Sequence, residues 1–350
     1  MNRFLTEILE QRESVRSTLD YYTREEGRTS LARVRDMFRS GNFEQIIFTG
    51  MGSSYFASYA ASCLFNTLGI RSYAMNTSEL LYYHASIVSD KALLVFLSQS
   101  GESVEVVKML DALPSGAFCI GITNREKSSL RARANVLLPI KAGREEMTST
   151  KTYTSTVLVT SILGWFIADM WPDAKVSQIR KFVAGIDEYL GDHEGVIEDL
   201  LSFFESGEFL QIIGRGPLYA TALQSELMFK EASKTAASGA LGGEFRHGPM
   251  EMVREGFRSI LFAAKGRTYN QSIRMGLDIA KYQGKVILIT NKDPHITDHG
   301  IRTITILQPD EYLFSIQSII PVQLMSYYLA LSNGHEPGSF VHGGKVTTSE

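Results

Sequence analysis

Short apolar runs that end in glycine- or serine-rich turns and lead into helical patterns recur along this chain. In the first half such runs lie at 45–49, 92–97 and 117–123. In the second half they lie at 210–213, 259–263 and 286–290. A strand, a turn and a helix in series are the unit of a parallel α/β sheet. The pattern therefore predicts an α/β fold in both halves.

The two halves match each other at three strand-to-turn junctions. The paired positions are 164, 165 and 167 residues apart, and they are Gly50 and Gly214, Gly101 and Gly266, and Asn124 and Asn291. So regular an offset indicates a duplicated domain, joined by the apolar helix predicted over 154–170 and the helix after it. Residues 3–40 read as two helices broken near Gly27. The predicted domains are an N-terminal helical segment at 1–28, a first domain at 29–185, a second domain at 186–335 and a tail at 336–350.

Composition excludes several classes of function. The formal net charge of −3 disfavours an electrostatic binder of nucleic acid. Cys63 and Cys119 both lie in apolar runs, which indicates neither a disulfide framework nor a zinc site. The N-terminus lacks the apolar core of a signal peptide. The longest apolar segment, 157–170, is shorter than the ~20 residues that span a bilayer. We therefore expect a cytoplasmic protein without a membrane partner.

The two turns of the first half are rich in hydroxyl groups. They carry Ser53, Ser54, Ser98, Gln99, Ser100 and Ser103. Each turn opens a helix, where free backbone N–H groups and the helix dipole attract an anion. The first half therefore predicts a phosphate site, and serine N-caps are the competing structural explanation. The glycines at 50 and 52 do not complete a dinucleotide fingerprint, because Tyr55 stands where the third glycine belongs. No cofactor or metal is predicted.

The stretch 230–249 is the candidate for catalysis in the second half. A predicted helix ends at Glu231, and a run of small residues at 236–243 reads as a flexible loop. His247 follows that run. A carboxylate and an imidazole are the groups that acid–base chemistry on a small polar molecule needs. Glu244 is a second candidate for the base, and an ordinary charged surface loop is the structural alternative.

These motifs together resemble those of double sugar-isomerase (SIS) domain proteins. The resemblance rests on Gly50–Ser54, Ser98–Ser103, Ser149–Thr154, Lys230–Glu231 and Arg246–Pro249, in that order along the chain. The most similar members are the isomerase half of glucosamine-6-phosphate synthase and the fructosamine-6-phosphate deglycases. The resemblance implies two three-layer α/β/α domains of flavodoxin-like type. It also implies a homodimer that binds a sugar phosphate at sites shared between subunits.

The resemblance also assigns roles to residues. The six polar residues of the first-half turns would grip a 6-phosphate, and Glu231 would be the general base. His247 would act near the ring oxygen from a partner subunit. The C-terminal 344–347 matches a segment whose lysine enters the site in the synthase, so Lys345 is a third catalytic candidate. A frayed terminal charge is the alternative explanation for Lys345.

Two departures from the synthase pattern favour a different reaction. Gln224 and Met228 stand where the synthase has an acidic residue and a lysine, and the chain begins without a glutaminase domain. The remaining pair, Glu231 and His247, resembles that of the deglycases. We therefore expect release of an amine from an amino-ketose 6-phosphate. The alternatives are an aldose–ketose isomerase of hexose 6-phosphates and a non-catalytic sugar-phosphate sensor.

Overall fold

A computed structural model describes the chain except for residues 1, 42, 187–189, 191–192, 205–208 and 348–350. The chain forms two compact units. The first unit consists of Glu10–Ala184 and Val341–Glu350, and the second of Met1–Leu9 and Gly185–Phe340. The predicted division into four consecutive segments remains a proposal, and part of each segment lies outside the described residues.

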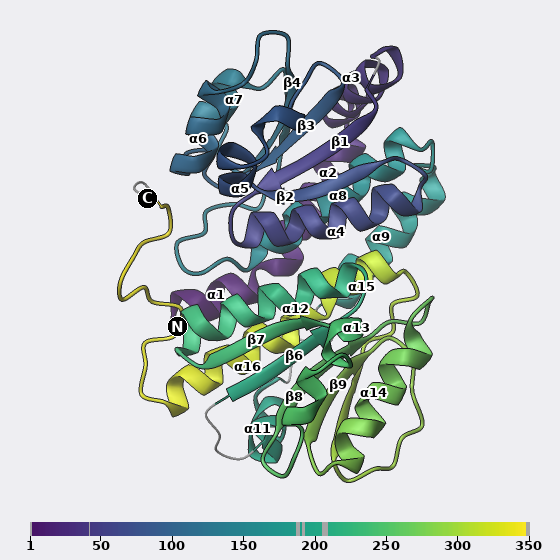
Figure 1. The fold of residues 1–350 in the computed structure, drawn as a ribbon, viewed down its shortest axis with the longest axis vertical. Helices are drawn as coiled ribbons and strands as arrows, with labels where there is room; N and C mark the ends of the chain where they lie inside the picture. The colour runs from purple at the N-terminus through teal and green to yellow at the C-terminus, as the bar shows by residue number, and fades with distance from the viewer. Residues whose placement is uncertain (1, 42, 187–189, 191–192, 205–208, 348–350) are drawn as a thin grey trace. The chain divides into compact units, whose positions relative to one another are not determined.

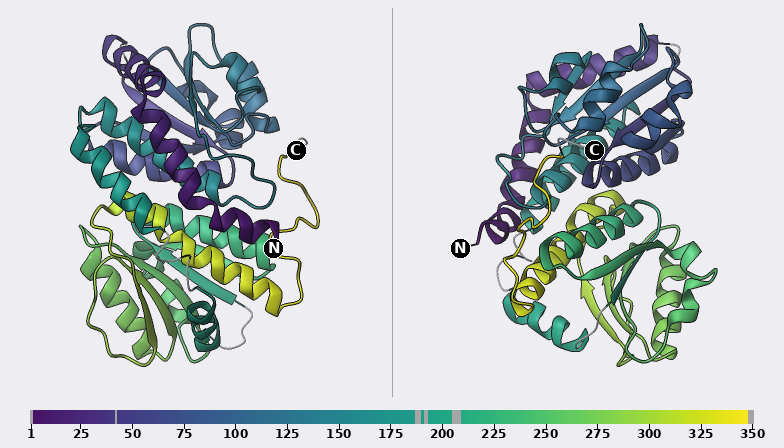
Figure 2. Two further views of the ribbon diagram at one scale, coloured as in Figure 1. Left: turned by 180° about the vertical axis from the view of Figure 1, so that it is seen from behind. Right: turned by 60° about the vertical axis from the view of Figure 1, so that its left-hand side comes forward.

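The first unit is built on a five-stranded parallel sheet in the order β2-β1-β3-β4-β5. The strands are β1 (Gln45–Gly50), β2 (Ser72–Asn76), β3 (Ala92–Leu97), β4 (Phe118–Thr123) and β5 (Val136–Pro139). Every residue of β3 is buried, as expected for the central strand of a sheet that is covered on both faces. Helices lie on both sides of the sheet in Figures 1 and 2.

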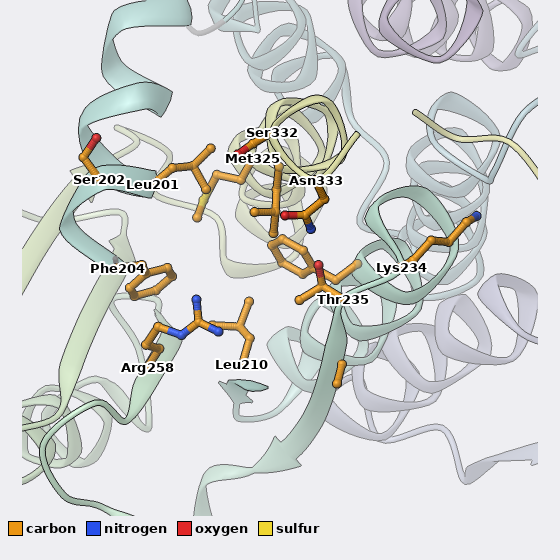
Figure 3. Close-up of a pocket in the computed structure, with 13 residues that line it drawn as sticks. Leu201, Ser202, Phe204, Leu210, Lys234, Thr235, Arg258, Met325, Ser332 and Asn333 are labelled. Atoms are coloured by element: carbon orange, nitrogen blue, oxygen red, sulfur yellow. The ribbon is translucent and has the colours of Figure 1, made fainter. Parts of the chain in front are cut away.

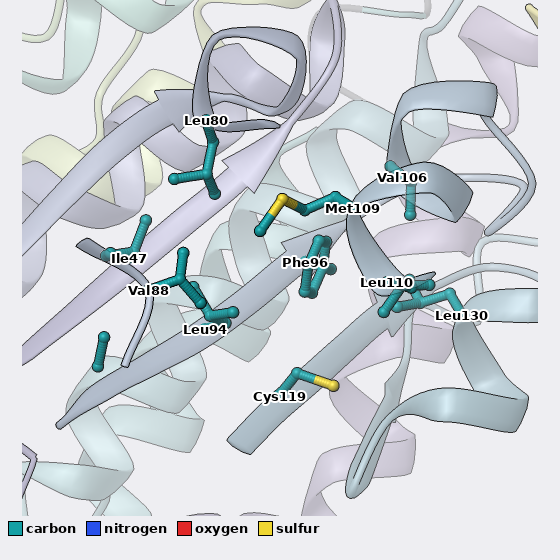
Figure 4. Packing of buried hydrophobic residues seen from close by; sticks show 11 residues of the cluster. Ile47, Leu80, Val88, Leu94, Phe96, Val106, Met109, Leu110, Cys119 and Leu130 are labelled. Carbon is teal, nitrogen blue, oxygen red and sulfur yellow. The ribbon is translucent and has the colours of Figure 1, made fainter. Parts of the chain in front are cut away.

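The helices of the first unit follow the strands in alternation. They are α2 (Gln11–Thr23), α3 (Glu25–Ser40), α4 (Ser53–Thr67), α5 (Thr77–Tyr82), η1 (Ala85–Ile87), α6 (Val104–Asp111), α7 (Ser129–Arg133), α8 (Lys151–Ile167) and α9 (Asp173–Gly185), which ends at the boundary between the units. One face of the sheet packs against α5, α6 and α7 (Figure 4). There Phe96 of β3 lies among Met109, Leu110 and Leu130, all of them buried. Area buried in this way stabilises a fold by roughly 25 cal/mol per Å² of apolar surface.

The second unit repeats this architecture with the order β10-β9-β8-β6-β7, again all parallel. Its strands are β6 (Phe209–Gly214), β7 (Ala236–Leu241), β8 (Arg258–Ala263), β9 (Lys285–Thr290) and β10 (Ile301–Thr305). Its helices are α1 (Arg3–Leu9), α11 (Glu194–Phe204), α12 (Pro217–Met228), η2 (Phe229–Ser233), α13 (Gly242–Phe245), η3 (Pro249–Met252), α14 (Tyr269–Lys281), α15 (Glu311–Gln317) and α16 (Ile319–Ser332). Both sheets have the flavodoxin-like strand order 2-1-3-4-5, so the predicted fold class is confirmed.

One local prediction is wrong. The run of small residues at 236–243 is not a flexible loop, because its first six residues form the edge strand β7, paired with β6. The small side chains allow α12 to pack closely: a Cβ atom on Gly239 would lie 3.0 Å from the Glu226 carboxylate and 3.2 Å from the Ala222 carbonyl oxygen.

The N-terminal helices break near Gly27, as predicted, because α2 ends at Thr23 and α3 begins at Glu25. A further break separates α1 from α2, so this region holds three helices and not two. Gly27 itself lies inside α3 and lets that helix approach the end of α2, since a Cβ atom there would meet the Tyr21 carbonyl oxygen at 2.3 Å.

Two apolar segments are largely buried. In α8, every residue from Lys151 to Ile167 is buried except Phe166. The stretch Glu311–Ser332, which covers α15 and α16, is the one described segment long and apolar enough to cross a membrane by length and composition. Of its most apolar window, 83% is buried inside the protein, which is the position of a core helix.

Candidate functional site

The two hydroxyl-rich turns of the first unit lie side by side. They follow β1 and β3, which are paired neighbours, and the strand order reverses between these two strands. In open α/β sheets, ligands bind in the crevice outside the carboxyl ends of the strands at this reversal. A Cβ atom on Gly50 would lie 2.8 Å from the Leu97 carbonyl oxygen, so glycine is needed for the turns to come this close. Ser53 and Ser54 begin α4 beside the crevice.

The second turn holds its hydroxyl groups in fixed positions. Ser98 Oγ accepts a hydrogen bond from the Gly101 N–H at 3.0 Å, and Ser100 Oγ accepts one from the Glu102 N–H at 3.2 Å. Both serines are buried. Because each oxygen acts as an acceptor in these bonds, its own proton remains able to donate to a ligand. Gln99 contributes its backbone carbonyl to the Asn124 N–H and the Thr123 hydroxyl.

The N-cap explanation does not account for Ser53 or Ser103. The N-cap of α4 is Gly52, with φ 50° and ψ −125°, and Ser53 is the first helical residue. Ser103 is the N-cap of α6, but its side chain makes no capping hydrogen bond. Elsewhere in the same unit, Asn76 and Ser128 do cap α5 and α7 through their side chains. Ser53 and Ser103 therefore do not act as ordinary caps.

A buried carboxylate, which the sequence analysis missed, lies at the start of α8. The Glu145 side chain is completely buried and accepts hydrogen bonds from the backbone N–H groups of Thr150 and Thr152, at 2.9 and 3.0 Å. The hydroxyl groups of the same two threonines also donate to it, at 3.1 and 2.5 Å. Its charge partner comes from the C-terminal tail: Lys345 Nζ lies 2.5 Å from Glu145 Oε2 and 2.7 Å from the Met147 carbonyl oxygen.

The tail is thus attached to the first unit. Beyond Lys345, the Thr347 carbonyl accepts a hydrogen bond of 3.2 Å from the N–H of Val104, the residue after Ser103. Burial raises the pKa of the Glu145 carboxyl, but the Lys345 ammonium and the Thr152 hydrogen bonds outweigh it, so the pKa is below its usual value. A frayed terminal charge does not describe Lys345, whose ammonium is bonded just before the start of α8.

In the second unit, Glu231 lies on a distorted helical turn. The residues Phe229–Ser233 form a single π-helical turn that continues α12 directly. Such turns are rare and occur often at functional sites. The turn ends at Lys234, whose backbone is left-handed with φ 57°. Glu231 is half-buried, whereas Gln224 and Met228 on α12 are both fully buried.

His247 lies at the other end of β7 from Glu231. Glu231 precedes this strand, and His247 follows it after the short helix α13, which carries the exposed Glu244. Six residues of extended strand span roughly 20 Å. One chain therefore does not bring its own Glu231 and His247 to one substrate. His247 is exposed, and its N–H is bonded to the Glu244 carbonyl at 2.9 Å.

A large cavity in the second unit lies elsewhere (Figure 3). It has a volume of about 1010 Å³ and lies beside the first residues of β6, β7 and β8, where Leu210, Ala236 and Arg258 line it. This is the amino end of the parallel strands, the opposite edge from that at which such sheets bind ligands. Among the described residues, no group of three or more His, Cys, Asp or Glu side chains could hold a metal ion.

Comparison with known proteins gives one family. The SIS domain family matches residues 42–164 and 205–333. Glutamine–fructose-6-phosphate aminotransferase (isomerizing) of Pyrococcus horikoshii is 31% identical over 304 residues, which cover 84% of this chain and 50% of that protein. The Thermococcus kodakarensis protein of the same name is 27% identical over 330 residues, covering 90% of this chain and 55% of its own. The chain spans about half the length of these curated relatives.

Solved structures show the same fold. The C-terminal domain of glucosamine-fructose-6-phosphate aminotransferase from Francisella tularensis superimposes with a TM-score of 0.87 at 23% identity, covering 95% of this chain and 96% of that one. Tagatose-6-phosphate ketose/aldose isomerase from Escherichia coli gives 0.80 at 20% identity, with coverages of 97% and 96%. Glucosamine-6-phosphate deaminase from Thermotoga maritima gives 0.76 at 20% identity, with 98% and 99%.

Proposed function

The chain belongs to the SIS domain family, and from this we propose that it is a phosphosugar enzyme that releases an amine from an amino-ketose 6-phosphate. The serines of the first-unit crevice bind the phosphate. Glu231 is the general base and His247 the general acid. One observation carries the proposal. Glu231 is half-buried on its π-helical turn, whereas Gln224 and Met228 are fully buried and cannot reach a substrate.

The chemistry follows from the substrate. An amino-ketose 6-phosphate carries a substituted amine on C1 beside the C2 carbonyl, and the carbonyl acidifies the C1 protons. Glu231 removes one of these protons while His247 protonates the C2 oxygen, which gives an enaminol. Protonation at C2 moves the double bond to C1 and nitrogen. Water adds to the C1 imine, the C1–N bond breaks with its electron pair on nitrogen, and the products are the amine and an aldose 6-phosphate.

Each residue in this scheme needs to accelerate the reaction only modestly. Positioned acid–base groups each accelerate a reaction by typically ~10²–10⁴-fold. A phosphate held in the crevice fixes the distant end of the sugar and orients C1 and C2 for proton transfer. Hydroxyl and N–H donors bind phosphate reversibly, because they add hydrogen bonds without a permanent counter-charge.

The separation of Glu231 and His247 along β7 supports a dimer with shared sites. If each site takes Glu231 from one subunit and His247 from the other, both residues reach one substrate although a single chain holds them apart. This arrangement predicts complementation between two inactive variants, since a mixed dimer of E231Q and H247N keeps one intact site. Statistical mixing then restores about a quarter of the activity of the unmodified protein.

An aldose–ketose isomerase of hexose 6-phosphates is the second candidate. It is favoured by the sequence relatives, whose name includes "isomerizing". An isomerase would shuttle the proton between C1 and C2 without breaking the C1–N bond.

A single assay separates these functions. The protein is incubated with fructosamine 6-phosphate adducts, and free amine and aldose 6-phosphate are measured together. Equal amounts of both support the proposal. Sugar isomerisation without amine release assigns the second candidate, and binding without turnover shows a sensor. Mixing E231Q with H247N in the same assay and recovering no activity contradicts the shared site.

A further inference from the structure

The turn that carries Glu231 ends at an unusual residue. Lys234 occupies the left-handed conformation, with φ 57° and ψ 27°, directly after the π-helical turn. Glycine is the usual residue at such a helix end, because a side chain there costs roughly 1 kcal/mol. A lysine at this position therefore needs another reason, and its side chain provides one.

The Lys234 ammonium connects two segments of the second unit. It donates to the carbonyl oxygen of Glu231, and it donates to the carbonyl oxygen of Ser339 at 2.5 Å. In Figure 3 the Lys234 side chain extends away from the residues of the cavity. A second bond runs in parallel, from the Gly338 N–H to the Ala232 carbonyl at 3.4 Å. The chain that leaves α16 thus returns to the turn of the proposed base.

The same segment is fixed on its other side by the N-terminal helix. A Cβ atom on Gly338 would lie 2.7 Å from the Phe4 side chain, so the backbone passes directly over that ring. The Glu336 carboxylate accepts a hydrogen bond of 2.6 Å from the Asn2 side chain. Residues 336–340 are therefore held on two sides before the chain continues to Lys345.

We propose that Lys234 is a positioning residue that ties the start of the C-terminal tail to the turn of Glu231. The inference rests on the proposed function, in which Glu231 is the general base, and on Lys345 as the third catalytic candidate. Only five residues lie between Ser339 and Lys345, so the position of the first sets how far the second can move. One of its two carbonyl partners, that of Glu231, lies at the negative end of a helix, where an ammonium is favoured. Lys234 does not itself touch the substrate.

The test is Lys234→Gly. If Lys234 only closes the helix, glycine is the better residue, so the variant should keep full turnover and gain stability. If Lys234 positions the tail, the variant keeps or gains thermal stability but loses about tenfold in kcat with little change in KM. Lys234→Arg, which retains a charged donor, should recover most of the loss.

Gln283→Gly is the matched control. Gln283 is an exposed residue of the same unit with φ 68°, just after α14, so its replacement removes the same backbone strain without touching the tail. It should raise stability and leave kcat unchanged.

Hydrogen exchange gives a readout that does not depend on the reaction. Peptides covering residues 335–347 should exchange at least several-fold faster in Lys234→Gly than in the unmodified protein or in Gln283→Gly. Unchanged exchange in these peptides overturns the inference, whatever the turnover. An active E231Q, in contrast, contradicts the proposed function and leaves the exchange result standing.

Discussion

The two halves of this protein share a backbone plan and differ in the side chains that fill it. The residue before α4 is Gly52, with φ 50° and ψ −125°, and its counterpart before α12 is Gly216, with φ 55° and ψ −134°. An asparagine follows the fourth strand of each sheet and binds the next loop: Asn124 Nδ2 donates to the Gly143 carbonyl and Asn291 Nδ2 to the Gln308 carbonyl, at 2.6 and 2.7 Å. The two halves therefore share backbone angles and hydrogen bonds at equivalent positions, as expected of a duplicated domain.

The crevices at the point where the strand order reverses differ in chemistry. The first unit places serine hydroxyl groups there. In the second unit the Glu311 carboxylate lies against the glycine turns, with its oxygens 3.3 Å and 3.9 Å from where Cβ atoms on Gly266 and Gly216 would lie. Burial raises the pKa of the Glu311 carboxyl, and nearby Arg267 partly opposes this. A carboxylate in this place disfavours a second phosphate. The shared backbone architecture therefore does not by itself create a phosphate site.

The largest effect is expected at the proposed base of the second unit. Glu231→Gln should lower kcat by about 10³-fold, because the amide cannot take a proton. KM should change little, since the proposed phosphate site lies in the other half. Steady-state kinetics of amine release measure both quantities.

Glu244→Gln is the control for that variant, because Glu244 is exposed on α13, at the other end of β7 from Glu231. It should retain activity within about twofold. A fall in Glu244→Gln combined with an active Glu231→Gln moves the base to Glu244.

A smaller effect is expected from the tail pair in the first unit. Lys345→Met leaves the buried Glu145 carboxylate without its charge partner, which should cost about 2–3 kcal/mol of unfolding free energy. Urea denaturation gives the value. Adding Glu145→Gln should recover part of the loss, since the amide is neutral. Strictly additive losses in the double variant would show that the two side chains do not interact.

The Glu145–Lys345 pair makes the stability of the folded protein depend on pH. The pKa of Glu145 is lowered in the folded state, so its contribution to stability is present above the ordinary glutamate pKa of about 4.3. The contribution is lost as the pH falls through the lower, folded-state value. Thermal unfolding followed between pH 7 and pH 3 should therefore show a steeper acid loss than Glu145→Gln shows. Parallel curves for the two proteins contradict this assignment.

Substitutions at two equivalent N-cap residues allow the two crevices to be compared directly. Ser103 and Thr268 hold equivalent positions at the starts of α6 and α14, and neither side chain makes a capping hydrogen bond. Ser103→Ala should raise KM about tenfold, which corresponds to one lost hydrogen bond to a charged group. Thr268→Ala should leave KM unchanged. Equal effects in the two variants would remove the distinction between the halves.

The smallest effect is expected at Glu311. Its raised pKa means that the charged carboxyl slightly destabilises the folded state as the pH rises through the folded value. Glu311→Gln should therefore raise the unfolding free energy at neutral pH, by less than about 1 kcal/mol. Calorimetry at pH 7 and pH 4 tests this, since the gain should shrink at the lower pH.

The sequence predicts the interior of each sheet well and its edges poorly. The apolar runs of β1, β3, β4, β6, β8 and β9 are continuous, because these strands are covered on both faces. The edge strands β2 and β7 read Ser-Tyr-Ala-Met-Asn and Ala-Ala-Ser-Gly-Ala-Leu, and these sequences have little strand propensity of their own. Pairing with a neighbour makes them strands, and a local pattern does not contain that neighbour.

Some residues of the candidate site could likewise be predicted from the sequence, and others could not. Turns that carry their donors within a few residues, such as Ser98–Ser103, could be found from their own sequence. Glu145 could not, because its partner Lys345 lies 200 residues away. Nor does any local signal show that Glu231 and His247 lie at opposite ends of one strand, since the small residues between them read as a loop.

The grouping of α1 with the second unit has a consequence for how the chain is made. Phe4 and Ile8 are fully buried, and α1 packs on α16, which ends at Ser332. A ribosome adds about 5–20 residues per second, so the first helix waits roughly 15–60 s for its binding surface to be synthesised. During that interval these two apolar side chains stay in water on the nascent polypeptide, where a holding chaperone or a premature encounter between neighbouring nascent chains can reach them.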